Sequence, residues 1–169
     1  MQRKLVIFDL DETLVHATQV PLAGVHDMEV PPYFVYQRPF VHELLGFAFE
    51  FFDVGVWSSS SKEYVAAVTE HLFSNYPLKF AWSVEKCVQR PDPRTNGYVY
   101  IKDLRKLQSL GFKPERITII DDSPEKVQRQ PRSHLPVKPF TGDFQDSELL
   151  EIKSALQSML SQSRASAIS

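Results

Sequence analysis

Residues 5–15 constrain the fold of this chain more than any other stretch. They begin with four apolar residues, Leu5 to Phe8, and continue with two acids two positions apart, Asp9 and Asp11. A short apolar run rich in β-branched residues is typical of a strand buried on both faces of a parallel sheet. Because side chains at i and i+2 lie on one side of an extended chain, we expect both carboxylates to face one pocket at the carboxyl end of the strand.

Two neighbouring carboxylates need a compensating charge. Like charges at close range repel, so either a cation lies between them or one of them holds a proton. A hard dication such as Mg²⁺ binds carboxylate, carbonyl and phosphate oxygens, and it would attract a phosphorylated ligand. For an Asp-x-Asp pair alone, an acidic turn in which Asp11 or Thr13 caps the next segment is an equal alternative. The longer string Asp-x-Asp-x-Thr after a β-branched run is more specific.

The string Asp9-Leu-Asp11-Glu-Thr13-Leu-Val-His16 resembles the nucleophile motif of the haloacid dehalogenase (HAD) superfamily of phosphatases. Within that superfamily it is similar to the FCP/SCP, NLI-interacting-factor-like branch, which contains the RNA polymerase II C-terminal-domain phosphatases and small bacterial relatives. The resemblance implies an α/β fold that is HAD-like (Rossmannoid), with a doubly wound parallel sheet and a small flap or hairpin insertion.

A run of hydroxyl side chains follows the second expected strand, Asp53–Trp57. The four serines at positions 58–61 could donate to phosphate oxygens, and the N-terminus of the next helix favours anions. They could equally cap the helix expected at Lys62–Phe73, and both roles are compatible. The resemblance places the second motif of the family, a Ser or Thr, at Ser58, and Ser59 is expected to bind substrate beside it.

A cation follows the strand that is expected at residues 98–101. Lys102 opens a segment, 103–110, that is expected to be a helix ended by Gly111. A lone lysine at a helix start is usually a surface charge. In the resembled family, however, the lysine of the third motif stands in a similar Ile-Lys-Asp-Leu context, where it would neutralise the nucleophile and the phosphoryl oxygens.

Paired acids directly follow another buried strand, at residues 116–120. Asp121 and Asp122 could cap a short helix, but that role alone would leave a costly cluster of charge without a cation. The fourth motif of the family is Asp followed by Asp or Asn, and this pair matches it. The resemblance thus implies a bound Mg²⁺ with the following ligands: Asp9, Asp11 through its carbonyl oxygen, Asp121 and Asp122.

The resemblance also assigns catalytic roles. Asp9 would attack phosphorus and form an aspartyl phosphate, whereas Asp11 would protonate the leaving oxygen and then deprotonate the attacking water. Ser58 and Lys102 would bind the phosphoryl oxygens, where transition-state charge accumulates, and Thr13 belongs to the same substrate-binding group. Asp11 must first be protonated, so its pKa has to be raised, and the phosphate dianion would do that.

The other segments are expected to complete the sheet and to cover the pocket. Residues 16–32 are rich in proline and glycine, so we expect a loop that forms a small hairpin with a strand at 33–36. Residues 76–97 are locally basic and form either a solvated loop or a surface that recruits acidic or phosphorylated partners. The remaining expected elements are helices at 39–51, 124–128 and 147–160, a strand at 80–84 and an edge strand at 135–140.

Composition limits the classes of function. The 169 residues, 43% hydrophobic and 24% charged, indicate one compact domain over residues 1–160, followed by a polar, frayed tail at 161–169. The net charge of -2 gives no reason to expect nucleic-acid binding. Cys87 is the only cysteine, so no internal disulfide is possible, and Pro93 occupies the position where a cysteine phosphatase would need arginine. With no apolar run that could span a bilayer, we expect a cytoplasmic protein, or a nuclear one if the source is eukaryotic.

The expected function is therefore Mg²⁺-dependent hydrolysis of a phosphomonoester. The resemblance favours phosphoserine or phosphothreonine in a flexible protein segment. A small phosphomonoester is the alternative, because we expect a short flap and do not expect the binding domain that is appended to the larger polymerase phosphatases. A third alternative is a catalytically silent binding module, as in a receptor subunit of the mitochondrial protein translocase that resembles this fold. The acids and the lysine of all four motifs are retained here, which favours an enzyme.

Overall fold

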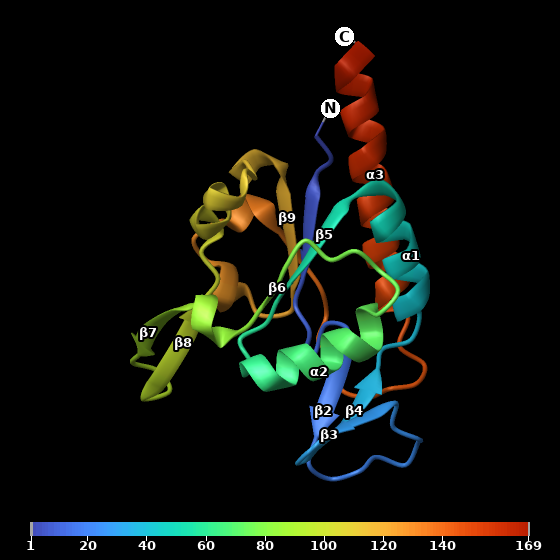
Figure 1. The fold of residues 1–169 in the computed structure, drawn as a ribbon, viewed down its shortest axis with the longest axis vertical. Coiled ribbons are helices and arrows are strands. Elements are labelled where there is room, and N and C mark those ends of the chain that lie inside the picture. Colours follow the sequence, from blue (N-terminus) through green and yellow to red (C-terminus); the bar gives the residue numbers. More distant parts are fainter. Residues whose placement is uncertain (1, 169) are drawn as a thin grey trace.

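The computed structural model describes residues 2–168, and within them five strands form a central parallel sheet. The strand order is β10-β9-β1-β5-β6, so the first strand lies at the centre (Figure 1). The bounds are β1 Leu5–Phe8, β5 Asp53–Trp57, β6 Ala81–Trp82, β9 Ile117–Asp121 and β10 His134–Pro136. The predicted strands are confirmed, although both edge strands are shorter than expected.

The two faces of the sheet are covered by different layers. Val6 and Phe8 pack in the larger core with the helices α1 (Val41–Phe51), α2 (Lys62–Phe73) and α3 (Glu148–Ile168). Leu5 and Ile7 point to the opposite face, where η2 (Leu104–Leu110) covers them. This alternation explains why all four residues of β1 are fully buried. The doubly wound α/β prediction is confirmed.

The register of the central strands determines where the acids leave the sheet. Phe8 pairs with Ile120 of β9 and with Val56 of β5. The next residue of each strand therefore reaches the same edge, and the amide of Asp9 donates to the Ile120 carbonyl at 3.0 Å. As a result, the polar residues that follow β1, β5 and β9 gather at one end of the sheet.

A small antiparallel sheet is inserted after β1. It consists of β2 (Val15–Thr18), β4 (Tyr33–Gln37) and β3 (Met28–Val30), in the order β2-β4-β3, and lies beside α2 (Figure 1). The predicted strand within β4 is confirmed. The predicted loop and hairpin were incomplete, because β2 and β3 pair with the two edges of β4 and make a three-stranded flap.

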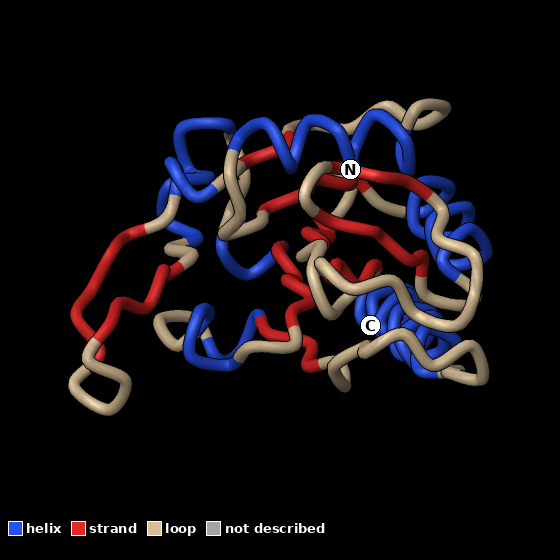
Figure 2. Tube along the Cα trace, turned by 90° about the horizontal axis from the view of Figure 1, so that it is seen from below, coloured by secondary structure: helices blue, strands red, loops and turns tan. Residues whose placement is uncertain are grey.

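A two-stranded hairpin projects from the body of the molecule in two perpendicular views (Figures 1 and 2). It pairs β7 (Val88–Asp92) with β8 (Gly97–Ile101). The prediction of a strand at residues 98–101 is confirmed, but the preceding segment is a strand rather than a loop. Because β8 leads directly into Lys102, the hairpin delivers this lysine to the edge of the sheet.

Several predicted helices differ from the observed elements. Helix α1 begins at Val41 rather than at Pro39, since Phe40 adopts a left-handed conformation (φ 67°) as its N-cap. The segment after Lys102 is a 3₁₀ helix, closed by Gly111 at φ 84°. The short 3₁₀ elements are η1 Val84–Lys86, η3 Pro114–Arg116, η4 Pro124–Val127 and η5 Pro131–Ser133.

Helix α3 is longer than predicted. It continues to Ile168, eight residues beyond the predicted end at Leu160, so the expected frayed tail is helical as far as the structure describes it. No glycine or proline interrupts residues 148–168, and helix formation therefore propagates through the polar segment. No helix within residues 2–168 is both long and apolar enough to cross a bilayer.

Candidate active site

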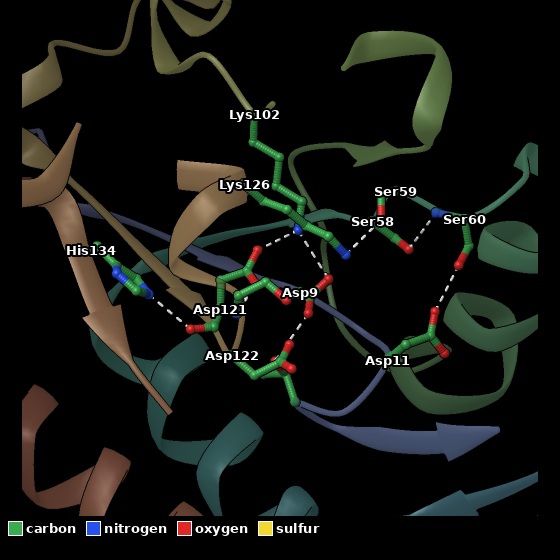
Figure 3. A network of polar contacts seen from close by, with 12 residues as sticks. Asp9, Asp11, Ser58, Ser59, Ser60, Lys102, Asp121, Asp122, Lys126 and His134 are labelled. Carbon is green, nitrogen blue, oxygen red and sulfur yellow. Dashed lines mark hydrogen bonds and ion pairs between the residues drawn. The ribbon is translucent and has the colours of Figure 1, made fainter. Parts of the chain in front are cut away.

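The carboxyl ends of β1 and β9 bring three acids together (Figure 3). Asp9 follows β1, Asp121 ends β9 and Asp122 follows it. Asp9 and Asp121 are buried, at 2% and 0% exposure, and Asp122 is half-buried. One carboxylate oxygen from each of these acids lies within 4.8 Å of the others.

Lys102 connects two of these acids. Its Nζ donates to Asp9 Oδ1 at 2.9 Å and to Asp121 Oδ2 at 2.5 Å, and the side chain is fully buried. Burial alone would lower the pKa of Lys102, but the two carboxylates outweigh burial and raise it. The lysine therefore remains charged, and it compensates the two buried acids that no solvent screens.

Thr13 and Asp122 complete the group around Asp9. The Thr13 hydroxyl is placed 3.1 Å from Asp9 Oδ2 and 3.5 Å from Asp122 Oδ1. Burial, and secondarily the charge of Asp9, raises the pKa of Asp122 to about 7. Three carboxylates at this separation provide the hard oxygen ligands that Mg²⁺ prefers, so these residues fit such an ion.

The Asp11 side chain lies apart from the three-acid cluster and contacts the opposite side of the site. Its Oδ2 accepts from the Ser60 hydroxyl at 2.7 Å, and its Oδ1 accepts from the Tyr64 hydroxyl at 2.5 Å. Burial raises the pKa of the Asp11 carboxyl, while these two hydrogen bonds oppose that shift. The carboxylate of Asp11 is therefore not a candidate metal ligand, and its backbone carbonyl stays a predicted one beside Asp9, Asp121 and Asp122.

The four serines after β5 separate into different roles. Ser61 caps α2 by accepting from the Tyr64 amide at 3.3 Å, which confirms the predicted cap. Ser58 is buried at the end of β5, and its Oγ accepts from the Ser60 amide at 3.0 Å. Ser59 faces Lys126, whose Nζ donates to its Oγ at 2.9 Å. Ser58 and Ser59 thus lie at the same end of the sheet as the acids, and their binding of phosphoryl oxygens stays a prediction.

The loop that carries Asp11 and Thr13 is held by a buried arginine. The Arg38 guanidinium donates to the Thr13 carbonyl at 3.1 Å and forms an ion pair with Asp146, with Nε 2.8 Å from its Oδ1. Arg38 is 1% exposed, so this arrangement is part of the protein interior. Arg38 therefore supports the loop that carries Asp11 and Thr13 from just before the start of α1.

A cavity of about 370 Å³ opens beside Asp11, between the flap and α2. Aromatic and polar groups mix on its wall, and the lining residues are Asp11, Glu12, Ala17, Tyr33, Ser60, Ser61 and Tyr64. The Tyr33 and Tyr64 rings meet edge to face, with their centroids 6.1 Å apart. A ligand that reaches Asp11 through this cavity would contact both the flap and the helix.

Two residues at the site, Tyr64 and Lys126, were not identified from the sequence, and Ser60 was expected as a phosphate donor or helix cap but not as a partner of Asp11. Tyr64 contacts an acid 53 positions earlier, and Lys126 contacts a serine 67 positions earlier. The one sequence signal available was position, because Lys126 follows the fourth-motif acids by four residues and Tyr64 lies in the first turn of α2.

Comparison with known proteins gives a consistent set of similar sequences. A family model described as NLI interacting factor-like phosphatase matches residues 4–166. Phosphatase Herzog from Drosophila melanogaster is 32% identical over 159 residues, which cover 90% of this chain and 43% of that protein. A human CTD small phosphatase-like protein is 29% identical over 157 residues, covering 89% of this chain and 54% of that protein. The chain thus spans about half the length of these curated relatives.

Similar solved structures identify the fold. The structure of Fcp1, an essential RNA polymerase II CTD phosphatase, aligns with a TM-score of 0.64 at 19% identity, over 98% of this chain and 48% of that one. A HAD-superfamily hydrolase from Geobacter sulfurreducens aligns with a TM-score of 0.54 at 14% identity, over 90% of this chain and 99% of that one. The predicted HAD-like α/β fold is therefore confirmed.

Proposed function

This chain belongs to the NLI interacting factor-like phosphatase family, and on that premise we propose that it hydrolyses phosphomonoesters through an aspartyl-phosphate intermediate in a Mg²⁺-dependent reaction. One observation carries the proposal: the buried Lys102 ammonium contacts the carboxylates of Asp9 and Asp121 where two adjacent parallel strands end. A carboxylate beside a fixed cation suits attack on a phosphoryl group, because the same cation can stabilise charge on the phosphoryl oxygens.

In the first step, an Asp9 oxygen bonds to phosphorus while the bond from phosphorus to the ester oxygen breaks. Asp11 gives its proton to that departing oxygen, which leaves as an alcohol. In the second step, Asp11 takes a proton from water as the water oxygen bonds to phosphorus. The bond between Asp9 and phosphorus then breaks, and both inorganic phosphate and the free carboxylate are released.

Mg²⁺ would be held by Asp9, Asp121, Asp122 and the Asp11 carbonyl. When bound, such an ion neutralises the acids and withdraws charge from the phosphoryl group. The fit rests on the three gathered carboxylates, all of which offer oxygen ligands.

The environment of Asp11 supports its role as the acid. A general acid must carry a proton before the reaction, and burial of the Asp11 carboxyl raises its pKa in that direction. The contacts with Ser60 and Tyr64 fix the carboxyl beside the cavity, so a leaving group in the cavity would meet it. Burial in the protein, and not only the substrate, therefore shifts the pKa of Asp11 in the direction that a general acid needs.

For the substrate, we propose phosphoserine or phosphothreonine in a flexible protein segment. The human relative and Fcp1 are named as CTD phosphatases, which supports a phosphoprotein. A small phosphomonoester is the second candidate, because the cavity of about 370 Å³ is suited to a compact leaving group. Ranking phosphopeptides and phosphorylated metabolites by kcat/KM separates the two. A cytoplasmic or nuclear location, and the single domain at residues 1–160, stay predictions.

The test of the proposed function is Asp9→Asn, assayed with p-nitrophenyl phosphate. We expect turnover to fall by at least about 10³-fold, because an amide cannot form the covalent intermediate. Asp143→Asn is a matched control at an exposed acid of the 142–146 turn, and it should retain activity.

Two further measurements address the chemistry directly. Excess EDTA should abolish wild-type turnover, and added Mg²⁺ should restore it. Beryllium fluoride, a mimic of the acyl phosphate, should bind to the wild type and not to Asp9→Asn. Turnover by Asp9→Asn at the wild-type rate would refute the assignment, and undiminished activity in EDTA would refute the metal role.

A further inference from the structure

A second lysine lies beside the site and has no role in the reaction described above. Lys126 is a half-buried residue of η4, four positions after Asp122. Its Nζ donates to Ser59 Oγ at 2.9 Å, so it connects η4 to the loop that follows β5 (Figure 3). This loop also carries Ser58, the predicted ligand of the phosphoryl group.

Lys126 differs from Lys102 in its partners. Lys102 contacts two carboxylates, whereas Lys126 forms no ion pair within 4.0 Å with any acid in residues 2–168. An ammonium group has three N–H donors, and the contact with Ser59 uses one of them. Lys126 thus presents a partly buried positive charge with donors available for an anion.

The backbone links the two lysines. The Lys102 amide donates to the Lys126 carbonyl at 2.7 Å, and this bond fixes η4 against the backbone of the buried lysine. Burial raises the pKa values of Asp11 and Asp122, and the charge of Lys126 opposes both shifts. The ammonium of Lys126 is therefore within electrostatic reach of acids on both sides of the site.

The site carries an excess of negative charge that Lys126 could offset. Asp9, Asp121 and Asp122 lie together at this end of the sheet and Asp11 lies to one side of them (Figure 3), and the proposed reaction requires a phosphate dianion to bind next to Asp9. Lys102 is already engaged by two of these acids. A second cation that is not neutralised by an acid would reduce the repulsion between these carboxylates and the incoming dianion.

We propose that Lys126 is a second phosphoryl-binding cation, which contacts a non-bridging oxygen of the group transferred to Asp9. Ser59 takes part in the same contact: its Oγ accepts from Lys126, and its own hydrogen remains free to donate to another phosphoryl oxygen. Lysine binds phosphate as a point charge, so this contact needs no bidentate geometry. The proposal rests on the proposed function in one respect, because it places the phosphoryl group next to Asp9.

The test compares Lys126→Met with Lys126→Arg. Binding of inorganic phosphate, measured by titration calorimetry with Mg²⁺ present, should weaken about tenfold in the Met variant, and KM for p-nitrophenyl phosphate should rise by a similar factor. The Arg variant keeps the charge and should stay within about threefold of the wild type. Lys106→Met is the matched control, because Lys106 is exposed and its Nζ donates only to the Lys86 carbonyl, at 2.6 Å.

A purely structural role for Lys126 gives a different pattern. If the lysine only braces the loop through Ser59, then Lys126→Met should add nothing in a Ser59→Ala background. On our proposal, phosphate binding in that background still weakens several-fold. Unchanged phosphate affinity in Lys126→Met, or a loss that Arg does not rescue and that follows a lower melting temperature, overturns the proposal.

The outcome is separable from that of the proposed function. If the wild type binds phosphate more tightly than Lys126→Met but hydrolyses no phosphomonoester, the activity is refuted and the role of Lys126 is supported. An active enzyme whose phosphate affinity and KM are the same with Met at position 126 would refute the role of Lys126 and leave the activity intact.

Discussion

Asp9 and Asp11 are two positions apart, yet the two sides of the site treat them differently. The Asp9 side is ionic, because its carboxylate contacts the buried Lys102 and lies next to two more acids. The Asp11 side has neutral partners, because both carboxylate oxygens accept from hydroxyl groups, of Ser60 and Tyr64. Residues 9–11 provide two similar acids, and the different surroundings of these acids come from residues that are distant in sequence, Lys102 on one side and Ser60 and Tyr64 on the other.

This difference separates the chemistry of the two acids. The Lys102 ammonium, 2.9 Å from Asp9 Oδ1, balances the charge of the carboxylate that we propose as the nucleophile. Burial raises the pKa of Asp11, which is the direction that a proton donor needs, and the Ser60 and Tyr64 hydroxyls oppose part of this shift. The end of β8 reaches one acid and the start of α2 reaches the other, so the fold gives different surroundings to two acids that are two positions apart.

The largest effect is expected from Lys102→Met, which removes the cation from the ionic side of the site. We expect activity to fall by about 10²–10³-fold. Without Mg²⁺ the free energy of unfolding should fall by about 3–5 kcal/mol, because two buried carboxylates lose their partner. Denaturant unfolding with and without Mg²⁺ measures this effect. Lys79→Met, at a half-exposed lysine 3.8 Å from Asp53, should cost less than about 1 kcal/mol. Equal losses for both variants would contradict the ionic role.

A smaller effect is expected from Tyr64→Phe, which removes one hydroxyl from the Asp11 side. Without this contact Asp11 is less well positioned, so kcat for a phosphoserine peptide should fall about tenfold. Turnover of p-nitrophenyl phosphate should fall less, because p-nitrophenolate leaves without a proton. Tyr33→Phe alters the other tyrosine of the same cavity and should have little effect on either substrate. Equal losses for both substrates would indicate a packing defect instead.

The smallest effect concerns Asp103, an acid adjacent to Lys102 in sequence but held by cations outside the site. Contacts with Arg105, and then with Arg129, hold the pKa of Asp103 well below its usual range. Because the folded-state pKa is depressed, the stabilisation is present above the ordinary value near 4 and is lost as pH falls below it. Asp103→Asn should lower the free energy of unfolding at pH 7 by about 1 kcal/mol, with a smaller difference at pH 3. Its kcat should stay within about twofold of the wild type, and a difference independent of pH would contradict the assignment.

The sequence predicted the parts of the fold that local pattern determines. The strands β1, β5 and β9 are apolar, β-branched runs that only a doubly covered sheet can bury, and the capping serine of α2 is a local signal. In contrast, β2, β3 and β7 mix polar and apolar residues without a continuous apolar run, and their strand conformation depends on the partner that pairs with them. Pro91 within β7 even argues against a strand unless the edge position is known.

The candidate site divides in the same way. Its acids could be located because Asp9 follows one buried strand and Asp121 ends another, and ligands bind at that edge in such sheets. Tyr64 and Lys126 could not, because their contacts depend on β5 lying beside β1 in the sheet and on the packing of η4. The catalytic and metal-binding roles of these residues stay predictions until the variants are measured.

The pairing of Phe8 with Ile120 limits how this chain can change in length during evolution. Deletion of one residue from β1 or β9 would turn the acid that follows it to the other face of the sheet, away from Lys102, since side chains alternate along a strand. The turns at residues 19–27 and 93–96 carry no such restriction. Insertions and deletions among homologues should accumulate in those turns, while the spacing from Leu5 to Asp9 and from Ile117 to Asp121 stays constant.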